Sequence, residues 1–167
     1  MRLNDAESGV YWTASAQDSQ ICYTCPVKMH AESSMGKVVV RTCDGKVYPG
    51  FSRKEDVGDD KVKIITRDGK EKFFATNELK GLFFVKDFKG DPEYDPVKFL
   101  NRNSVKASVW VHVEFEDGEV IEGMVRDHMS LLFSSGFYLW PSDEDNNNGL
   151  IYIVKKAIRD FEILSAE

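Results

Sequence analysis

Apolar and polar residues alternate along residues 109–116, and this period of two predicts a strand with one buried face. The apolar positions on one side are Val109, Val111, Val113 and Phe115. Asp117-Gly118 follows, a pair that favours a tight hairpin because the central turn positions accept positive φ. We therefore expect a return strand from Val120, with Gly123 at a bend or bulge.

The same pattern occurs 73 residues earlier in the chain. Asp44-Gly45 and Gly50 have the spacing of Asp117-Gly118 and Gly123, and Val38 and Val40 align with Val111 and Val113. We interpret this as an internal repeat, with an offset that suits two tandem domains.

Short apolar runs complete each copy. They are residues 61–66, 72–75 and 82–85 in the first copy, and residues 137–140, 150–154 and 161–164 in the second. Asp68-Gly69 predicts a further hairpin. Five short strands in each copy are expected to curl into a small barrel. The predicted fold is mainly β, with two tandem five-stranded small barrels.

Domain boundaries follow from changes in composition. Residues 1–34 show no sustained periodicity and are interpreted as a weakly ordered N-terminal extension, with Met35 as a hypothetical working start codon. We place the first barrel at residues 35–88 and the second at residues 107–165. The Gly, Asp and Pro residues of 89–106 indicate a linker.

Composition and charge limit the classes of function. The net charge of −6 argues against a general nucleic-acid binder, although residues 37–100 carry a net charge of +2. No apolar run is long enough for a transmembrane helix, and the start of the chain lacks the layout of a signal peptide. Three cysteines and no secretion signal favour a reducing, cytoplasmic setting.

The order of strands and hairpins in each copy resembles an Sm-like or SH3-like barrel. The segment 123–132 is similar to the base-recognition segment of Sm-like proteins, and the segment 158–163 is similar to the segment that completes their RNA pocket. Ser130 and Asp160 depart from these two signatures.

Residues 35–164 also resemble a family of uncharacterised bacterial proteins. The resemblance is carried by the Asp-Gly motif and its later Gly, by residues 83–88, and by the segment 136–147. It implies a cytoplasmic bacterial protein associated with signalling or surface motility.

Two segments contain candidate metal ligands. Cys22, Cys25 and His30 have the spacing of three zinc-knuckle ligands, but Met35 stands at the fourth position. The loop 142–149 alternates oxygen donors in the manner of a calcium loop, but it lacks the required Gly and the final Glu. We expect a reduced or adventitiously oxidised cysteine pair and a solvated hairpin loop, and predict no metal or cofactor.

Two surfaces are candidates for partner binding. Trp110, His112 and Trp140 are predicted on outer strand faces, where exposed aromatic side chains mark a protein contact or a contact between the two copies. The alternative is RNA or nucleotide binding by a cluster of basic residues beside Phe73 and Phe74. The cluster comprises Lys61, Lys63, Arg67, Lys70 and Lys72.

The sequence offers little support for catalysis. The histidines are His30, His112 and His128, and none lies in a recognisable nucleophile or metal motif. We expect a non-enzymatic adaptor that contacts a protein partner, or a second copy of itself, through exposed strand edges and aromatic residues.

Overall fold

The computed structural model describes residues 34–90, 108–143 and 145–166, which form ten strands, three 3-10 helices and one α-helix. The strands of the first half are β1 (Gly36–Thr42), β2 (Val47–Ser52), β3 (Lys61–Thr66), β4 (Glu71–Ala75) and β5 (Leu79–Val85). Those of the second half are β6 (Val109–Phe115), β7 (Val120–Val125), β8 (Gly136–Pro141), β9 (Asn148–Val154) and β10 (Ile158–Ala166). The helices are η1 (Lys54–Asp56), η2 (Thr76–Glu78), α1 (His128–Phe133) and η3 (Lys155–Ala157).

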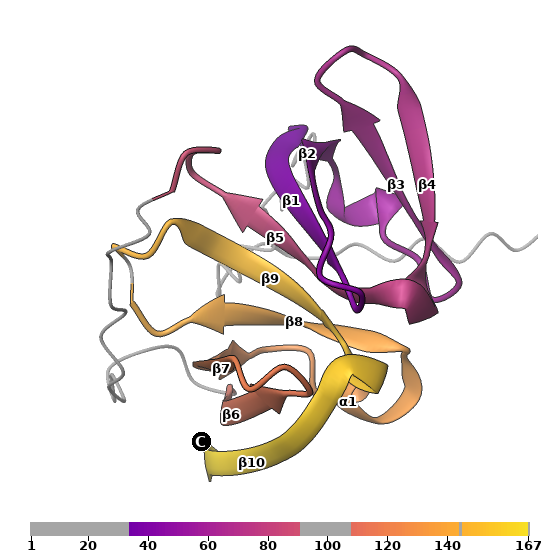
Figure 1. The fold of residues 1–167 in the computed structure, drawn as a ribbon. Helices are drawn as coiled ribbons and strands as arrows, with labels where there is room; N and C mark the ends of the chain where they lie inside the picture. The colour runs from indigo at the N-terminus through magenta and orange to yellow at the C-terminus, as the bar shows by residue number, and fades with distance from the viewer. Residues whose placement is uncertain (1–33, 91–107, 144, 167) are drawn as a thin grey trace, which may run out of the picture. The chain divides into compact units, whose positions relative to one another are not determined.

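All ten strands belong to one antiparallel sheet with the order β10-β6-β7-β8-β9-β5-β1-β2-β3-β4 (Figure 1). The mainly β fold class predicted from the sequence is confirmed. Two separate closed barrels are not seen, because the hydrogen-bonded strands form one continuous sheet. The physical reason is the pairing of β5 with β9, which joins the last strand of the first half to the fourth strand of the second. The predicted N-terminal extension and most of the predicted linker lie outside the described residues.

The two halves have matching strand orders. In each half the last strand lies beside the first, which is followed by the second, third and fourth. Each last strand also has a register shift near its start, between Arg41 and Thr42 in the β1–β5 pair and between Ile158 and Asp160 in the β6–β10 pair. Positions in one half can therefore be matched to positions in the other by pairing register alone.

Three hairpin turns are built on Asp-Gly pairs, as the sequence predicts. Gly45, Gly69 and Gly118 have φ of 82°, 81° and 83°, which is the left-handed region that glycine enters without steric cost. In the first two turns a threonine hydroxyl, from Thr42 or Thr66, bonds the aspartate of the turn. These contacts fix the register of the strands on either side.

The buried apolar side chains form two clusters, one in each half. The first-half cluster contains Val38, Val40, Val62, Ile64, Phe74, Leu79, Leu82, Tyr152 and Val154. The second-half cluster contains Val109, Val111, Val113, Phe115, Val125, Phe137, Leu139, Ile151, Ile153, Ala157 and Phe83. Each cluster thus includes side chains from the other half, and all of these come from β5 or β9.

Strands β5 and β9 are buried on both faces. On β5, Leu82 points into the first-half cluster and its neighbour Phe83 into the second. On β9, Ile151 and Tyr152 divide in the same way. Continuous apolar runs, rather than alternating ones, are typical of strands covered on both sides. This β5–β9 seam therefore holds the two halves together by backbone pairing and by shared burial.

Candidate functional site

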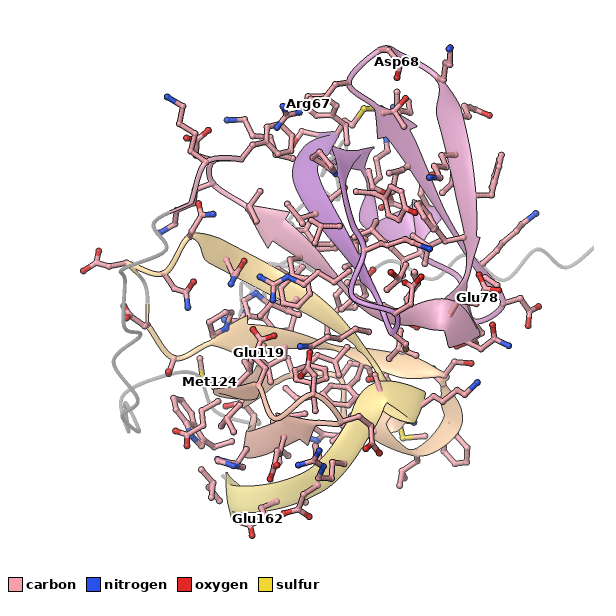
Figure 2. The ribbon with its side chains drawn as sticks, in the orientation of Figure 1. Arg67, Asp68, Glu78, Glu119, Met124 and Glu162 are labelled. Atoms are coloured by element: carbon pink, nitrogen blue, oxygen red, sulfur yellow. The ribbon has the colours of Figure 1, made fainter. Side chains whose placement is uncertain are left out.

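Strand β10 presents a free edge. It pairs with β6 along one side, and no described strand pairs with its other side. Ile163 is 59% exposed and Leu164 is 48% exposed, although both are large apolar residues. Figure 2 shows Glu162 on this outermost strand, with its side chain directed away from the ribbon. An unpaired strand edge with exposed apolar residues is a template for strand addition.

Strand β4 is the other free edge of the described sheet, and it pairs only with β3. Phe73 lies on its outer face and is 53% exposed, whereas Phe74 points into the first-half cluster. Lys72 lies on the same side as Phe74, with its ammonium nitrogen 3.6 Å from the ring centroid of Tyr48. β4 is shorter than β10 and presents a lysine beside its exposed aromatic ring.

A network of ion pairs links the first half to the Asp117-Gly118 turn. Arg41 on β1 bonds both carboxylate oxygens of Glu119, at 3.0 and 2.9 Å. Lys80 on β5 donates to Asp117 and to Glu119. The Lys80 side chain is only 7% exposed, and its ammonium lies 4.5 Å from the ring centroid of Phe115. Two cations and two carboxylates therefore neutralise one another where the halves meet.

The same network lowers the pKa of Asp117. The hydrogen bond from Lys80 is the main reason why the pKa of the Asp117 carboxyl lies below its ordinary value. The direction is that expected for a carboxylate beside a cation. The network therefore favours the charged form of Asp117.

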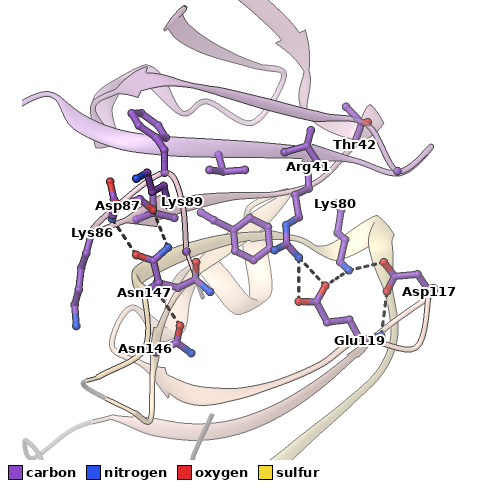
Figure 3. A pocket seen from close by; sticks show the side chains of 18 of the residues that line it. Arg41, Thr42, Lys80, Lys86, Asp87, Lys89, Asp117, Glu119, Asn146 and Asn147 are labelled. Carbon is purple, nitrogen blue, oxygen red and sulfur yellow. Dashed lines mark hydrogen bonds and ion pairs between the residues drawn. The ribbon is translucent and has the colours of Figure 1, made fainter. Parts of the chain in front are cut away.

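A cavity of about 790 Å³ adjoins this network. Arg41, Lys80, Asp117 and Glu119 line one end of it, and residues 145–148 line the other, as Figure 3 shows for the labelled members of both groups. Phe83 and Phe88 contribute apolar surface between the two ends. The four charged residues at the first end balance in charge, so this end favours neither anions nor cations.

The loop 142–149 uses its polar groups to hold its own backbone. Asp143 accepts a hydrogen bond from the Asp145 N–H at 2.9 Å, and Asn146 accepts one from the Asn148 N–H at 2.9 Å. Asn147 bonds the backbone of Asp87. Among the described residues no group of three or more His, Cys, Asp or Glu side chains has metal-binding geometry. The solvated-hairpin interpretation of this loop stays a prediction.

Helix α1 was not predicted from the sequence. Asp127 caps it by accepting hydrogen bonds from the backbone N–H groups of Met129 and Ser130. Met129, Leu132 and Phe133 are exposed, with Phe133 at 77%. They have the i, i+3, i+4 spacing of one helix face, which is the signal that could have identified the helix. The second half therefore exposes this apolar face of α1 in addition to Ile163 and Leu164 of β10.

The aromatic residues predicted to bind a partner lie in three different environments. The expected exposure of Trp110 is wrong: its side chain is 5% exposed, on a strand flanked by Met124 of β7 and Ser165 of β10. His112 is half-buried and its Nδ1 lies 2.9 Å from Glu122. Trp140 is half-buried, with Arg126 and Lys54 over its ring. Their role in partner binding stays a prediction.

The basic residues of the alternative function do not form one face. Lys61 and Lys63 lie on the outer face of the β3–β4 hairpin, whereas Lys72 lies on the opposite face. Lys63 pairs with Asp56 and Glu71, Lys70 with Asp68, and Figure 2 shows Arg67 and Asp68 at the tip of the hairpin.

Aromatic rings contact others of these cations. The Arg67 guanidinium lies 4.3 Å from the ring centroid of Phe88, and the Lys61 ammonium lies 5.6 Å from that of Phe73. Carboxylates therefore compensate the charges of Lys63 and Lys70, and aromatic rings hold Lys61, Arg67 and Lys72 in place.

Arg159 and Asp127, one from each segment similar to an Sm-like signature, have structural roles. Arg159, in the segment similar to an RNA-pocket signature, pairs with Glu114 at 2.8 Å, and Asp127, in the other such segment, caps α1. Cys22, Cys25 and His30 lie outside the described residues. Cys43, by contrast, is a free and exposed thiol in the first hairpin turn.

The described residues define a mainly β protein with a continuous sheet, two edges that no other described strand covers and a charge-balanced cavity. Residues 34–165 match the model of a family of unknown function, DUF6982, and the chain belongs to that family. No curated protein and no solved structure matches the chain. Within the described residues no helix is long and apolar enough to cross a membrane.

Proposed function

We propose that this protein is a non-enzymatic binding module that receives a strand of a protein partner along the free edge of β10. The observation that carries the proposal is the exposure of Ile163 and Leu164 on a nine-residue strand that, among the described strands, pairs with β6 alone. Unpaired N–H and C=O groups on such an edge supply affinity, and the side chains beside them supply specificity.

The chemistry of the cavity supports a binding role over catalysis. Lys80, the most buried ion in the described residues, is held between two carboxylates rather than aimed at open space. Arg41 is held in the same way by Glu119 and stacks over Phe83 at 4.4 Å. Each of these four groups is bound to another member of the network, which favours a structural role for them.

We further propose that each half is an open five-stranded unit of the Sm-like or SH3-like kind. The matching strand orders and the matching Asp-Gly turns support this. Each unit then has two edges, its last strand and its fourth strand. The setting expected from the sequence, a bacterial cytoplasm and a signalling or motility system, is part of the same proposal.

The test is a pull-down from the native cell, with and without nuclease, using wild-type protein and two variants. Ile163→Lys places a charge on the β10 edge, and lysine at an edge opposes strand addition. Leu132→Lys is the matched control, because it makes a similar change at an exposed apolar residue of α1. We expect the protein partner to be lost with Ile163→Lys and kept with Leu132→Lys. Recovery of nucleic acid alone from an untreated lysate would contradict the proposal.

A further inference from the structure

The β5–β9 seam joins the last strand of one half to the fourth strand of the other. A last strand and a fourth strand also form the two free edges of the described sheet. The free strands are β10, the last strand of the second half, and β4, the fourth strand of the first half. We propose that β10 of one copy pairs with β4 of the next copy in the register of the seam. This inference rests on the proposed function and names the partner of the β10 edge.

Pairing registers identify the matching positions on the last strands. Phe83 and Phe84 of β5 lie opposite Val39 and Val38 of β1. Glu162 and Ile163 of β10 lie opposite His112 and Val111 of β6, the residues that match Val39 and Val38. Glu162 therefore takes the place of Phe83, and Ile163 that of Phe84.

The fourth strands match in the same way. Ile151 of β9 lies opposite Leu139 of β8, and Lys72 of β4 lies opposite Ile64 of β3. Leu139 and Ile64 occupy equivalent places, counted from the pairs Gly123–Pro141 and Gly50–Thr66. Lys72 therefore takes the place of Ile151, and the next residue, Phe73, takes that of Tyr152.

The transferred register gives two complementary pairs, and it places Ile163 opposite Glu71. In the seam, Phe83 pairs with Ile151 and Leu82 pairs with Tyr152. In the proposed joint these pairs become Glu162 with Lys72, and Phe161 with Phe73. The first is a pair of opposite charges. The second covers the exposed ring of Phe73, just as Tyr152 is covered in the cluster of the other half.

One position limits how closely the joint can copy the seam. A Cβ on Gly81 would lie 2.6 Å from the carbonyl oxygen of Tyr152, so the seam requires a residue without a side chain there. Asp160 occupies the matching position on β10. The joint therefore covers Phe161–Ile163 and is displaced at Asp160. We expect a weak, concentration-dependent association in the wild type.

A joint between two different edges adds copies one after another, because each added copy presents a new free edge. A joint between identical edges would stop at a dimer. Sedimentation equilibrium of the full chain over a wide concentration range distinguishes the two. We expect the mean mass to rise past that of a dimer.

Charge exchange tests the register directly. Glu162→Lys places two lysines opposite each other and is expected to weaken association about fivefold or more. Lys72→Glu places two glutamates opposite each other. Mixing the two variants restores opposite charges at every joint and is expected to restore association. Because Lys72 also contacts the ring of Tyr48, the folding of Lys72→Glu is checked by circular dichroism. If Lys72→Glu is unfolded, Glu162→Lys alone tests the register.

Asp160→Gly supplies a test by gain of association. It restores the residue type found at Gly81 and is expected to tighten association several-fold. Asp145→Gly, which removes the same charge from an exposed loop, is the control and is expected to have no effect.

A chain that stays monomeric at the highest concentration, with Asp160→Gly as with the wild type, would overturn the inference. A dimer insensitive to Glu162→Lys would also overturn it. If such a monomer still captures a partner that Ile163→Lys releases, the proposed function stands without the inference. If a captured partner ignores Ile163→Lys, it is the proposed function that fails.

Discussion

The side-chain amide of Asn147 binds both the N–H and the C=O of Asp87, which lies 60 residues earlier in the sequence. Its side-chain oxygen accepts a hydrogen bond from the Asp87 N–H at 2.9 Å, and its side-chain nitrogen donates to the Asp87 carbonyl at 2.9 Å. The Asn147 carbonyl in turn accepts a hydrogen bond from the Lys86 N–H at 2.8 Å. Asn147 thus continues the β5–β9 pairing beyond the end of the strands and closes one end of the cavity (Figure 3).

Asn147→Ala removes two hydrogen bonds to the backbone and is expected to lower the free energy of unfolding by about 1–3 kcal/mol. The reason is that the N–H and C=O of Asp87 lose their partners together. Asn77→Ala, at an exposed asparagine of η2, is the control and is expected to change stability little. Urea denaturation measures the stability, and hydrogen exchange at the Asp87 amide locates the change. An unchanged exchange rate at Asp87 would contradict the role of Asn147.

Lys80→Met is expected to raise the pKa of Asp117 towards its ordinary value of 3.8, because the main cause of its depression is the hydrogen bond from Lys80. A depressed pKa stabilises the folded state above the unfolded pKa, and this stabilisation is lost as the pH falls through the folded pKa. The wild type should therefore lose more stability below about pH 4 than the variant does. An NMR titration of the Asp117 carboxyl measures the pKa. The same pKa in both proteins would show that Lys80 does not set it.

Tyr152→Phe is expected to reduce the loss of stability in alkali. Burial raises the pKa of Tyr152 to about 12, so the folded state retains a proton that the unfolded state releases near its ordinary value of about 10. Stability is complete below the unfolded pKa and is lost as the pH rises through the folded pKa. Denaturation of both proteins between these pH values measures the difference. Equal slopes would mean that the Tyr152 hydroxyl is not buried.

Gly123→Ala is expected to destabilise the fold by about 1–3 kcal/mol, because a Cβ there would lie 2.2 Å from the carbonyl oxygen of Trp140. Gly149→Ala is the control, since the nearest atom to a Cβ at that position is 4.0 Å away. Thermal denaturation of the two variants compares them. A normal melting temperature for Gly123→Ala would show that β7 and β8 are not this closely packed.

The parts of the fold that depend on local chemistry could be predicted from the sequence. Asp117-Gly118 specifies its own turn, and the alternation before it identifies which face of β6 is buried. Three features were missed, and the first two of them depend on distant contacts. The apolar runs of β5 and β9 indicate buried strands but not that each is the other's partner. Trp110 follows the strand period and yet is covered. Helix α1 was missed although Met129, Leu132 and Phe133 have the spacing of one helix face, because its six residues show that spacing only once.

The site was predictable only in kind. Exposed strand edges were expected, but the sequence pattern of 161–164 does not say on which side β10 is free. The Arg41–Glu119 pair joins positions 78 residues apart, and no spacing rule links them. The charged network therefore became visible only with the fold.

Strand β10 is proposed to pair with a strand of a partner. Hydrogen exchange of the backbone amides, with and without the captured partner, tests this pairing most directly. We expect slower exchange at amides of Phe161–Leu164 on the free side of β10, with unchanged exchange in α1. Protection confined to α1 or to the residues lining the cavity, with β10 unchanged, would contradict the proposed pairing.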